Sequence, residues 1–365
     1  MTAEQVDKVE TATPPTQALA AGRSRFAGAG RATLELGLRI GGLFIAILIV
    51  GAIFTILQPA FLTEDVLVSL LRAMSSLAIM SLGLTLVIVV GEIDLSFGAA
   101  YGLVANVVAV LWILSGWSVY AAVAAALVVA VVLGLFNGLV VTRLRIPSFI
   151  VTLGSYNLLY GFSLLITRST TLNPTYPPPG RHIQTGDLNF FTVLSKQLGD
   201  VQISAEVFWM IAIALIVGFL LHRSLFGFRL LAIGGNAEAA RLARLPVRKY
   251  KVTAFVLCSV LAGIAGILDF AFIGSIQPDS GLANTFPVFA AVIIGGASLS
   301  GGQGTVVGTL GGALLLASLT TGLSLIASSP FAQQVFLGAV TIGAVLFDVY
   351  ARRALDRRRG LMLRT

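Results

Sequence analysis

The sequence has little charge and almost no cysteine or histidine. Charged residues are 11% of its 365 residues, against about 25% in an ordinary soluble domain, and hydrophobic residues are 57%. Its one cysteine, Cys258, excludes an internal disulfide and a thiolate metal site. Its two histidines, His182 and His222, lie far apart and lack the spacing of metal ligands. Several apolar stretches reach the roughly 20 residues that span a bilayer as helix, so we expect an integral membrane protein.

The basic residues are grouped rather than spread along the chain. Twenty of the 24 lysines and arginines fall in four clusters, at 8–39, 143–145, 223–251 and 352–364. Each cluster lies between or beside apolar segments, as the positive-inside rule predicts for cytosolic loops. The net charge of +8 does not indicate nucleic-acid binding, because no soluble domain carries basic residues interleaved with aromatics.

Apolar segments and charge together predict an all-α integral membrane protein with eight to ten transmembrane helices. The ten candidate segments are 37–57, 66–90, 95–114, 117–142, 148–167, 207–222, 252–272, 285–300, 304–324 and 331–350. Segment 285–300 is short and segment 304–324 is rich in glycine, so both are candidates for half-helices or re-entrant segments. With the N-terminus inside, the loops 58–65, 168–206 and 273–284 fall outside, and they carry only three basic residues.

This pattern divides the chain into three regions. Residues 1–36 are expected to be a flexible cytosolic tail, because they are polar and lack the order of a cleavable signal peptide. Residues 37–350 form the transmembrane domain, and residues 351–365 form a basic cytosolic tail. Both termini are therefore expected in the cytosol.

Two of the apolar segments are interrupted in the same way. Ile88-Val-Val-Gly-Glu-Ile-Asp-Leu-Ser-Phe-Gly98 aligns with Val292-Ile-Ile-Gly-Gly-Ala-Ser-Leu-Ser-Gly-Gly302 at a constant offset. A charged side chain near the bilayer centre costs roughly 2.5–3.5 kcal/mol, so Glu92 and Asp94 belong at a membrane surface or against a polar path. Interrupted apolar segments in corresponding halves indicate a transporter with an internal repeat and broken helices.

Two loops are long enough to have a role of their own. The outer loop 168–206 contains a proline-rich stretch that disfavours helix, and it suits a docking surface or a cover over the outer mouth. In the inner loop 223–251, Gly-Gly-Asn precedes a short amphipathic helix that is expected over 237–245 and ends near Pro246. This helix is interpreted as a segment that inserts into a cytosolic partner. The alternative is a basic connector held at anionic membrane lipid.

Four motifs in order resemble one family. They are Val-Gly-Glu-Ile-Asp-Leu-Ser-Phe-Gly at 90–98, Ile-Pro-Ser-Phe-Ile-Val-Thr-Leu-Gly at 146–154, Ala-Ile-Gly-Gly-Asn-Ala-Glu-Ala-Ala-Arg-Leu at 232–242, and the glycine-rich stretch 291–305. At this spacing the chain resembles, from about residue 66 to 350, the ribose/xylose-type permeases of bacterial ATP-binding-cassette importers.

The resemblance implies a permease subunit that imports a monosaccharide or similar small carbohydrate through the bacterial inner membrane by alternating access. It implies a cytosolic ATP-binding-cassette ATPase, a periplasmic substrate-binding protein and a second permease copy, in a homodimer, as partners. The chain itself is then no enzyme and holds no cofactor, and it has no phosphate-binding loop with its lysine. Two departures from the family, Glu92 and the stretch 282–287, leave a polyol, autoinducer, nucleoside or amino acid open as substrate.

Candidate residues follow from the polar groups within apolar segments. The candidates for the substrate pathway are Glu92, Asp94, Asn106, Asn137, Tyr156, Asn157 and Ser298. Asp94 is equally suited to cap the next helix, with Ser298 as a neutral cap in the second copy, and the amides are equally suited to join helices. By the resemblance, the candidates for ATPase contact are Gly234, Gly235, Asn236, Glu238 and Arg241.

Two charged residues near the outer ends of segments stand apart from these candidates. Arg72 is expected to extend outward or to pair with a carboxylate, and Asp269 is expected to face an outer vestibule. A self-contained ion-coupled transporter would instead use Glu92, Asp94 and Asp269 as proton or cation sites. A membrane enzyme would need a convergent cluster of catalytic residues, which two isolated histidines do not offer.

Overall fold

A computed structural model describes residues 41–180, 183–198, 203–326, 329, 331–343 and 346. The chain divides at Gly42, and the unit Leu43–Thr365 is the one described below. The tails predicted at 1–36 and 351–365 lie outside the described residues, as does part of the last predicted segment, 331–350.

The described residues are almost entirely helical, which confirms the predicted fold class. The helices are Gly41–Leu57, η1 (Pro59–Leu62), α2 (Glu64–Val89), α3 (Phe97–Ala109) with its π-helical extension η2 (Val110–Leu114), α4 (Val119–Leu144), α5 (Ser148–Thr167), α6 (Thr185–Val193), α7 (Ala205–His222), α8 (Leu225–Gly235), α9 (Ala237–Leu242), α10 (Val247–Ile273), η3 (Leu282–Asn284), α11 (Thr285–Ile294), α12 (Val306–Leu325) and Phe331–Gly343. Two short antiparallel strands, β1 (Gln197–Leu198) and β2 (Ile203–Ser204), precede α7.

Seven of these described helices are long and apolar enough to cross a membrane. They are α2, α3 with η2, α4, α5, α7, α10 and α12. The helices Gly41–Leu57 and Phe331–Gly343 are shorter, and the predicted segment 285–300 contains only the ten residues of α11. This corrects the predicted boundary, because the glycines at 295 and 296 end the helix, whereas the glycine-rich α12 is a full 20 residues.

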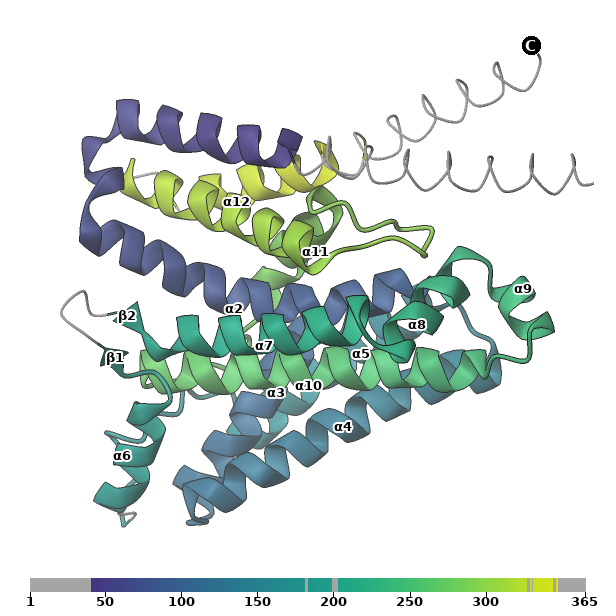
Figure 1. Ribbon diagram of the computed structural model, residues 1–365. Helices are drawn as coiled ribbons and strands as arrows, with labels where there is room; N and C mark the ends of the chain where they lie inside the picture. Colours follow the sequence, from purple (N-terminus) through teal and green to yellow (C-terminus); the bar gives the residue numbers. More distant parts are fainter. Residues whose placement is uncertain are drawn as a thin grey trace, which may run out of the picture. The chain divides into compact units, whose positions relative to one another are not determined.

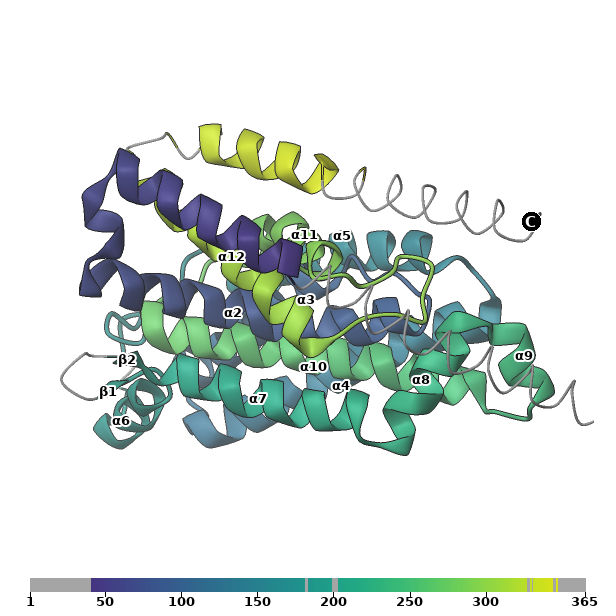
Figure 2. The same ribbon diagram turned by 45° about the horizontal axis from the view of Figure 1, so that its top comes forward.

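Helix α10 lies at the centre of the long helices, between α2 and α4 (Figures 1 and 2). It packs most extensively against these two helices, and its residues are mostly buried. Helices α8 and α9 lie at one end of the long helices, whereas α6 and the two strands lie at the other end (Figure 1). Helices α4 and α5 expose most of their apolar surface, as expected for helices that face lipid or another subunit.

The two interrupted segments have the same local backbone. After α2, Gly91 adopts a φ of 84° and Glu92 N donates to Val87 O at 3.0 Å. After α11, Gly296 adopts a φ of 89° and Ala297 N donates to Val292 O at 3.1 Å. Both helices therefore end in a Schellman motif, in which glycine takes the left-handed position.

A side-chain turn follows each of these caps. Asp94 Oδ1 accepts from Ser96 N at 2.8 Å, and Ser298 Oγ accepts from Ser300 N at 3.2 Å. The turns keep the sequence offset, whereas the second cap comes one residue later than that offset predicts, and the second interruption runs on to Thr305. Ser298 therefore repeats the backbone role of Asp94 without its charge.

Candidate functional site

The two interruptions and the end of α8 meet at one junction. Gly302 N donates to Val89 O at 2.8 Å, which joins the second interruption to the last residue of α2. A Cβ atom at Gly234 would lie 1.8 Å from Val89 O and 2.5 Å from Gly302 N, so only glycine fits there. The end of α8 is therefore in backbone contact with the last residue of α2 and with the second interruption.

The segment that follows the junction is a capped, exposed helix. Asn236 Oδ1 accepts from Ala239 N at 2.9 Å at the start of α9, as predicted, and the helix ends three residues early, at Leu242. Glu238 and Arg241 form an exposed ion pair at 3.2 Å. Of the five residues predicted to contact an ATPase, Gly235 and these three polar residues are exposed, whereas Gly234 is turned into the junction.

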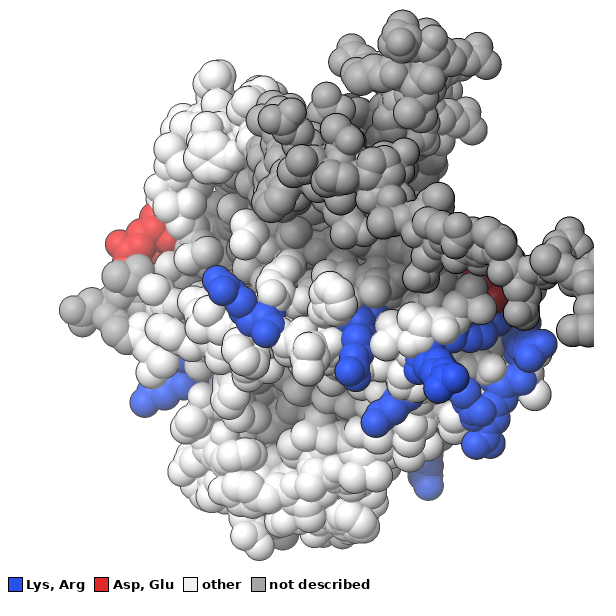
Figure 3. Space-filling model, turned by 45° about the vertical axis from the view of Figure 1, so that its right-hand side comes forward, with Lys and Arg blue, Asp and Glu red and all other residues white. Residues whose placement is uncertain are grey.

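Basic side chains surround this segment. Figure 3 shows lysine and arginine gathered at this end of the molecule. The exposed members along α8, α9 and the start of α10 are Arg223, Arg241, Arg244, Arg248 and Lys249. Such a concentration of positive charge marks the cytosolic side of a membrane protein.

Glu92 is held by an ion pair beside the junction. Its Oε1 atom pairs with Lys251 Nζ in the first turns of α10, and both side chains are mostly buried, at 12% and 20% exposed. The next residue, Ile93, donates its N–H to Ser148 Oγ at 3.1 Å at the start of α5. The first interruption is thereby fixed to both α10 and α5.

Asp94 belongs to a buried hydrogen-bonded chain that joins three segments. Ser96 Oγ donates to Asp94 Oδ1 at 2.6 Å, Asn137 Nδ2 on α4 donates to Ser96 Oγ at 2.8 Å, and Ser155 Oγ on α5 donates to Asn137 Oδ1 at 2.6 Å. All four residues are at most 4% exposed. Asn137 thereby joins helices, as in the alternative reading, whereas Asp94 accepts from Ser96, the residue at the N-cap position of α3, and among the described residues makes no cap hydrogen bond to the first turn.

The other candidates for the pathway lie apart from this chain. Asn106 is buried on α3 and donates from Nδ2 to Gln277 O at 3.1 Å. Asn157 is exposed on α5, where, within the described part of the chain, its amide donates only to Leu153 O of its own helix, and Tyr156 beside it is half-buried. The seven candidates are thus spread along the spans, and none lines the cavity described next.

Arg72 and Asp269 form a charged cluster toward the opposite end of the long helices. Arg72 Nη1 on α2 lies 3.4 Å from Asp269 Oδ1 on α10 and 3.8 Å from Glu206 Oε2 at the start of α7. Asp269 Oδ2 accepts from Ser76 Oγ at 2.7 Å and from Tyr101 Oη at 2.5 Å. The prediction that Arg72 pairs with a carboxylate is confirmed. The cluster ties α2, α3, α7 and α10 together.

A cavity of about 380 Å³ opens beside this cluster. Its walls come from α2, α10, η3 with α11, α12 and the helix Phe331–Gly343. The polar residues of its lining are Arg72, Ser76, Asp269, Asn284, Thr320, Gln333 and Gln334. It lies about 25 Å along α2 from the junction at Val89. Asp269 therefore lines a cavity away from the basic end, and that this cavity is an outer vestibule stays a prediction.

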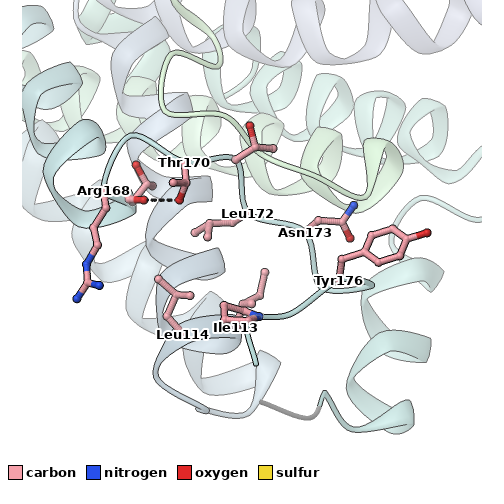
Figure 4. Close-up of a pocket in the computed structure, with 10 residues that line it drawn as sticks. Ile113, Leu114, Arg168, Thr170, Leu172, Asn173 and Tyr176 are labelled. Carbon is pink, nitrogen blue, oxygen red and sulfur yellow. Dashed lines mark hydrogen bonds between the residues drawn. The ribbon is translucent and has the colours of Figure 1, made fainter. Parts of the chain in front are cut away.

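A second cavity, of about 470 Å³, lies under the proline-rich outer loop (Figure 4). Thr170, Leu172 and Tyr176 line it together with Ile113 and Leu114 at the end of η2. Leu172 pairs with Ile276 as an isolated β-bridge, so this loop is attached to the loop that follows α10. The loop lies beside the end of η2 and the last residue of α5, and its role as a docking surface or a cover over the outer mouth stays a prediction.

The sequence reading missed that the polar cavity is a shared feature of five segments. Arg72 and Asp269 were visible as charges in apolar helices, but their partners were not. Glu206 lies just before the predicted span 207–222 and was not among the predicted site residues, although only 1% of its surface is exposed. Among the residues that the structure describes, no group of three or more His, Cys, Asp or Glu side chains could hold a metal ion.

Comparison with known protein families gives a match over most of the chain. A family model described as "Branched-chain amino acid transport system / permease component" matches residues 66–345, which contain both interruptions, the junction and both cavities. The chain belongs to this permease family. The resemblance stated from the four motifs is thereby confirmed, since the match covers the same part of the chain.

Named relatives of the permease match more than four-fifths of the chain. It is 36% identical over 306 residues to the ribose import permease protein RbsC of Escherichia coli strain K12, covering 83% of this chain and 92% of the relative. It is 30% identical over 368 residues to the xylose transport system permease protein XylH of the same organism, covering 87% and 94%. It is 30% identical to the L-arabinose ABC transporter permease protein AraH of Azospirillum brasilense, covering 88% and 90%.

Proposed function

We propose that this permease is the membrane subunit of an ATP-binding-cassette importer for a monosaccharide or a similar small carbohydrate. The observation that carries the proposal is the junction of Gly234, Val89 and Gly302. A movement of α8 acts directly on the end of α2 and on the second interruption, because their backbones are in contact, and α9 follows α8 directly in the chain. A cytosolic ATPase that engages α9 thus has a mechanical connection to the transmembrane helices.

The choice of a carbohydrate rests on the relatives. Three of them are named for ribose, xylose and arabinose, and the permease covers at least 90% of each. The permease holds no nucleotide in this scheme: the ATPase hydrolyses ATP, and a periplasmic substrate-binding protein delivers the sugar. The protein then resides in the bacterial cytoplasmic membrane with the basic α8–α9 end inside.

A second permease copy is part of the proposal. The exposed face of α5 carries the amide of Asn157 among large apolar side chains, and this amide bonds only its own helix. A polar amide that faces hydrocarbon is unfavourable, whereas at a helix–helix interface or beside a polar path it finds partners. A homodimer that places α5 near its axis would put Asn157 and Tyr156 where substrate passes.

The carboxylates weigh against an ion-coupled transporter. Glu92 is paired with Lys251, and Asp94 accepts two hydrogen bonds from Ser96. Neither is arranged as an open cation site. An importer that is driven by a separate ATPase needs no such site.

The test is reconstitution of the permease with its ATPase in liposomes, with a loaded binding protein on the outside. We expect uptake of a pentose that requires ATP and the binding protein. The same liposomes without ATPase but with a proton or sodium gradient serve as the control. Uptake driven by the gradient alone would overturn the proposal.

A further inference from the structure

We propose that the cavity beside Arg72 and Asp269 binds one small, neutral, polyhydroxylated solute on the outer side of the membrane. The assignment of the ligand rests on the proposed function, because it names a second place where the imported solute is held. The site lies within a single permease chain, apart from the α5 face where two copies are proposed to meet.

The charges of the site favour a neutral ligand. Asp269 is already engaged at both oxygens, by Arg72 at Oδ1 and by Ser76 and Tyr101 at Oδ2. An ammonium group would have to displace these partners. A carboxylate would have to compete with Asp269 and Glu206 for Arg72. A hydroxyl group neither displaces the partners of Asp269 nor competes for the charge of Arg72, because it adds a hydrogen bond without adding a charge.

The polar groups around the pair match a ligand with several hydroxyls. Among the described residues, the ion pairs of Arg72 use Nη1 alone, so the N–H groups of Nε and Nη2 remain for a ligand. The guanidinium lies 4.2 Å from the centre of the Phe272 ring, which limits its rotation. The side chains of Asn284 and Gln334 also line the cavity, and each amide offers both a donor and an acceptor.

The size and place of the cavity fit the same ligand. Its volume of about 380 Å³ lies at the small end of the range for ligand pockets, roughly 300–1,000 Å³. Apolar side chains form the rest of the wall, and three of them are the small residues Ala73, Ala283 and Ala317. It lies near the start of α2 and the end of α10, away from the basic α8–α9 end (Figure 1). A solute released outside would reach it before the junction.

The experiment uses cysteine protection in whole cells. The one native cysteine, Cys258, is fully buried, so labelling of the permease measures the reaction of the introduced thiol. Gln334→Cys places that thiol on the cavity wall, and a membrane-impermeant thiol reagent is applied from outside. We expect labelling that D-ribose or D-xylose slows at least about fivefold. Asn189→Cys, exposed on α6 and outside the cavity, is expected to be labelled at a rate that neither sugar changes.

A second variant tests recognition rather than access. Asn284→Ala on the Gln334→Cys background is expected to raise the half-protecting sugar concentration about five- to tenfold, the effect of one lost hydrogen bond. Asn189→Ala on the same background removes an amide outside the cavity and is expected to leave that concentration unchanged. Should Asn284→Ala fail to fold, the near-isosteric Thr320→Val takes its place.

The outcomes separate this site from the proposed function. Pentose uptake by the reconstituted importer, with labelling of Gln334→Cys unaffected by every pentose, would overturn the site and leave the function standing. Protection by L-leucine and not by pentoses would overturn the assigned ligand class. An importer that carries no monosaccharide or similar small carbohydrate would overturn the proposed function itself.

Discussion

The amide of Gly302 donates a hydrogen bond to the carbonyl oxygen of Val89, which lies 213 residues earlier in the chain. This bond satisfies one of the carbonyls that a helix C-terminus leaves open, and the group that satisfies it belongs to the other interrupted segment. The α-carbon of Gly234 lies against both groups. The two halves of the repeat and the inner loop are thus one mechanical unit.

Gly234→Ala is expected to destabilise the permease. The added methyl group would lie within 2.5 Å of two backbone atoms, and such overpacking costs about 1–3 kcal/mol. Thermal unfolding of the detergent-purified protein measures this as a lower apparent Tm. Gly235→Ala is the matched control, because a Cβ atom there meets nothing within 4 Å. Equal Tm values for the two variants would contradict the packing at the junction.

Lys251→Ala is expected to destabilise the first interruption by leaving Glu92 mostly buried without its partner. Because the pair retains some exposure, we expect a coupling energy of about 1 kcal/mol in a double-mutant cycle with Glu92→Gln. The swapped pair Glu92→Lys with Lys251→Glu is expected to recover part of the loss. Lys249→Ala removes an exposed lysine nearby and serves as the control. Additive effects of the two single variants would show that the contact contributes nothing.

Asn137→Ala is expected to cost about 2 kcal/mol, since it leaves the buried hydroxyls of Ser96 and Ser155 without their amide partner. Asn157→Ala is the comparison, because that exposed amide bonds only its own helix and its loss is expected to leave stability nearly unchanged. The apparent Tm of each purified variant measures its loss of stability. A larger loss for Asn157→Ala than for Asn137→Ala would refute the proposed difference between the two amides.

Arg72→Ala is expected to be the most destabilising of these changes, at about 3 kcal/mol, because it leaves Asp269 and Glu206 without a cation. Adding Glu206→Gln is expected to restore part of this loss by removing one of the two buried charges. Lys196→Ala, which removes an exposed lysine from the outer loop, is the control. If Glu206→Gln worsens the Arg72→Ala variant, the two carboxylates do not share the arginine.

The sequence alone determined the fold class and the family, and it predicted the side of each loop. Helical periodicity was not needed for this, because about 20 consecutive apolar residues already require a bilayer, and the grouping of arginine and lysine orients the chain. The sequence also predicted both interruptions, although it aligned Gly91 with Gly295 and the structure places the second cap glycine at Gly296. A glycine next to two carboxylates in the first segment, and a pair of glycines in the second, favour the end of a helix at these places.

Only the tertiary structure decided what the polar residues do. Asp94 and Asn137 lie 43 positions apart in sequence, and no local pattern states that Ser96 connects them. Similarly, Arg72 and Asp269 each appear as an isolated charge until α2 and α10 pack side by side. A sequence specifies which groups need a partner in an apolar medium. Which partner each group finds depends on how the helices rotate and pack, because that packing must satisfy all of these groups at once.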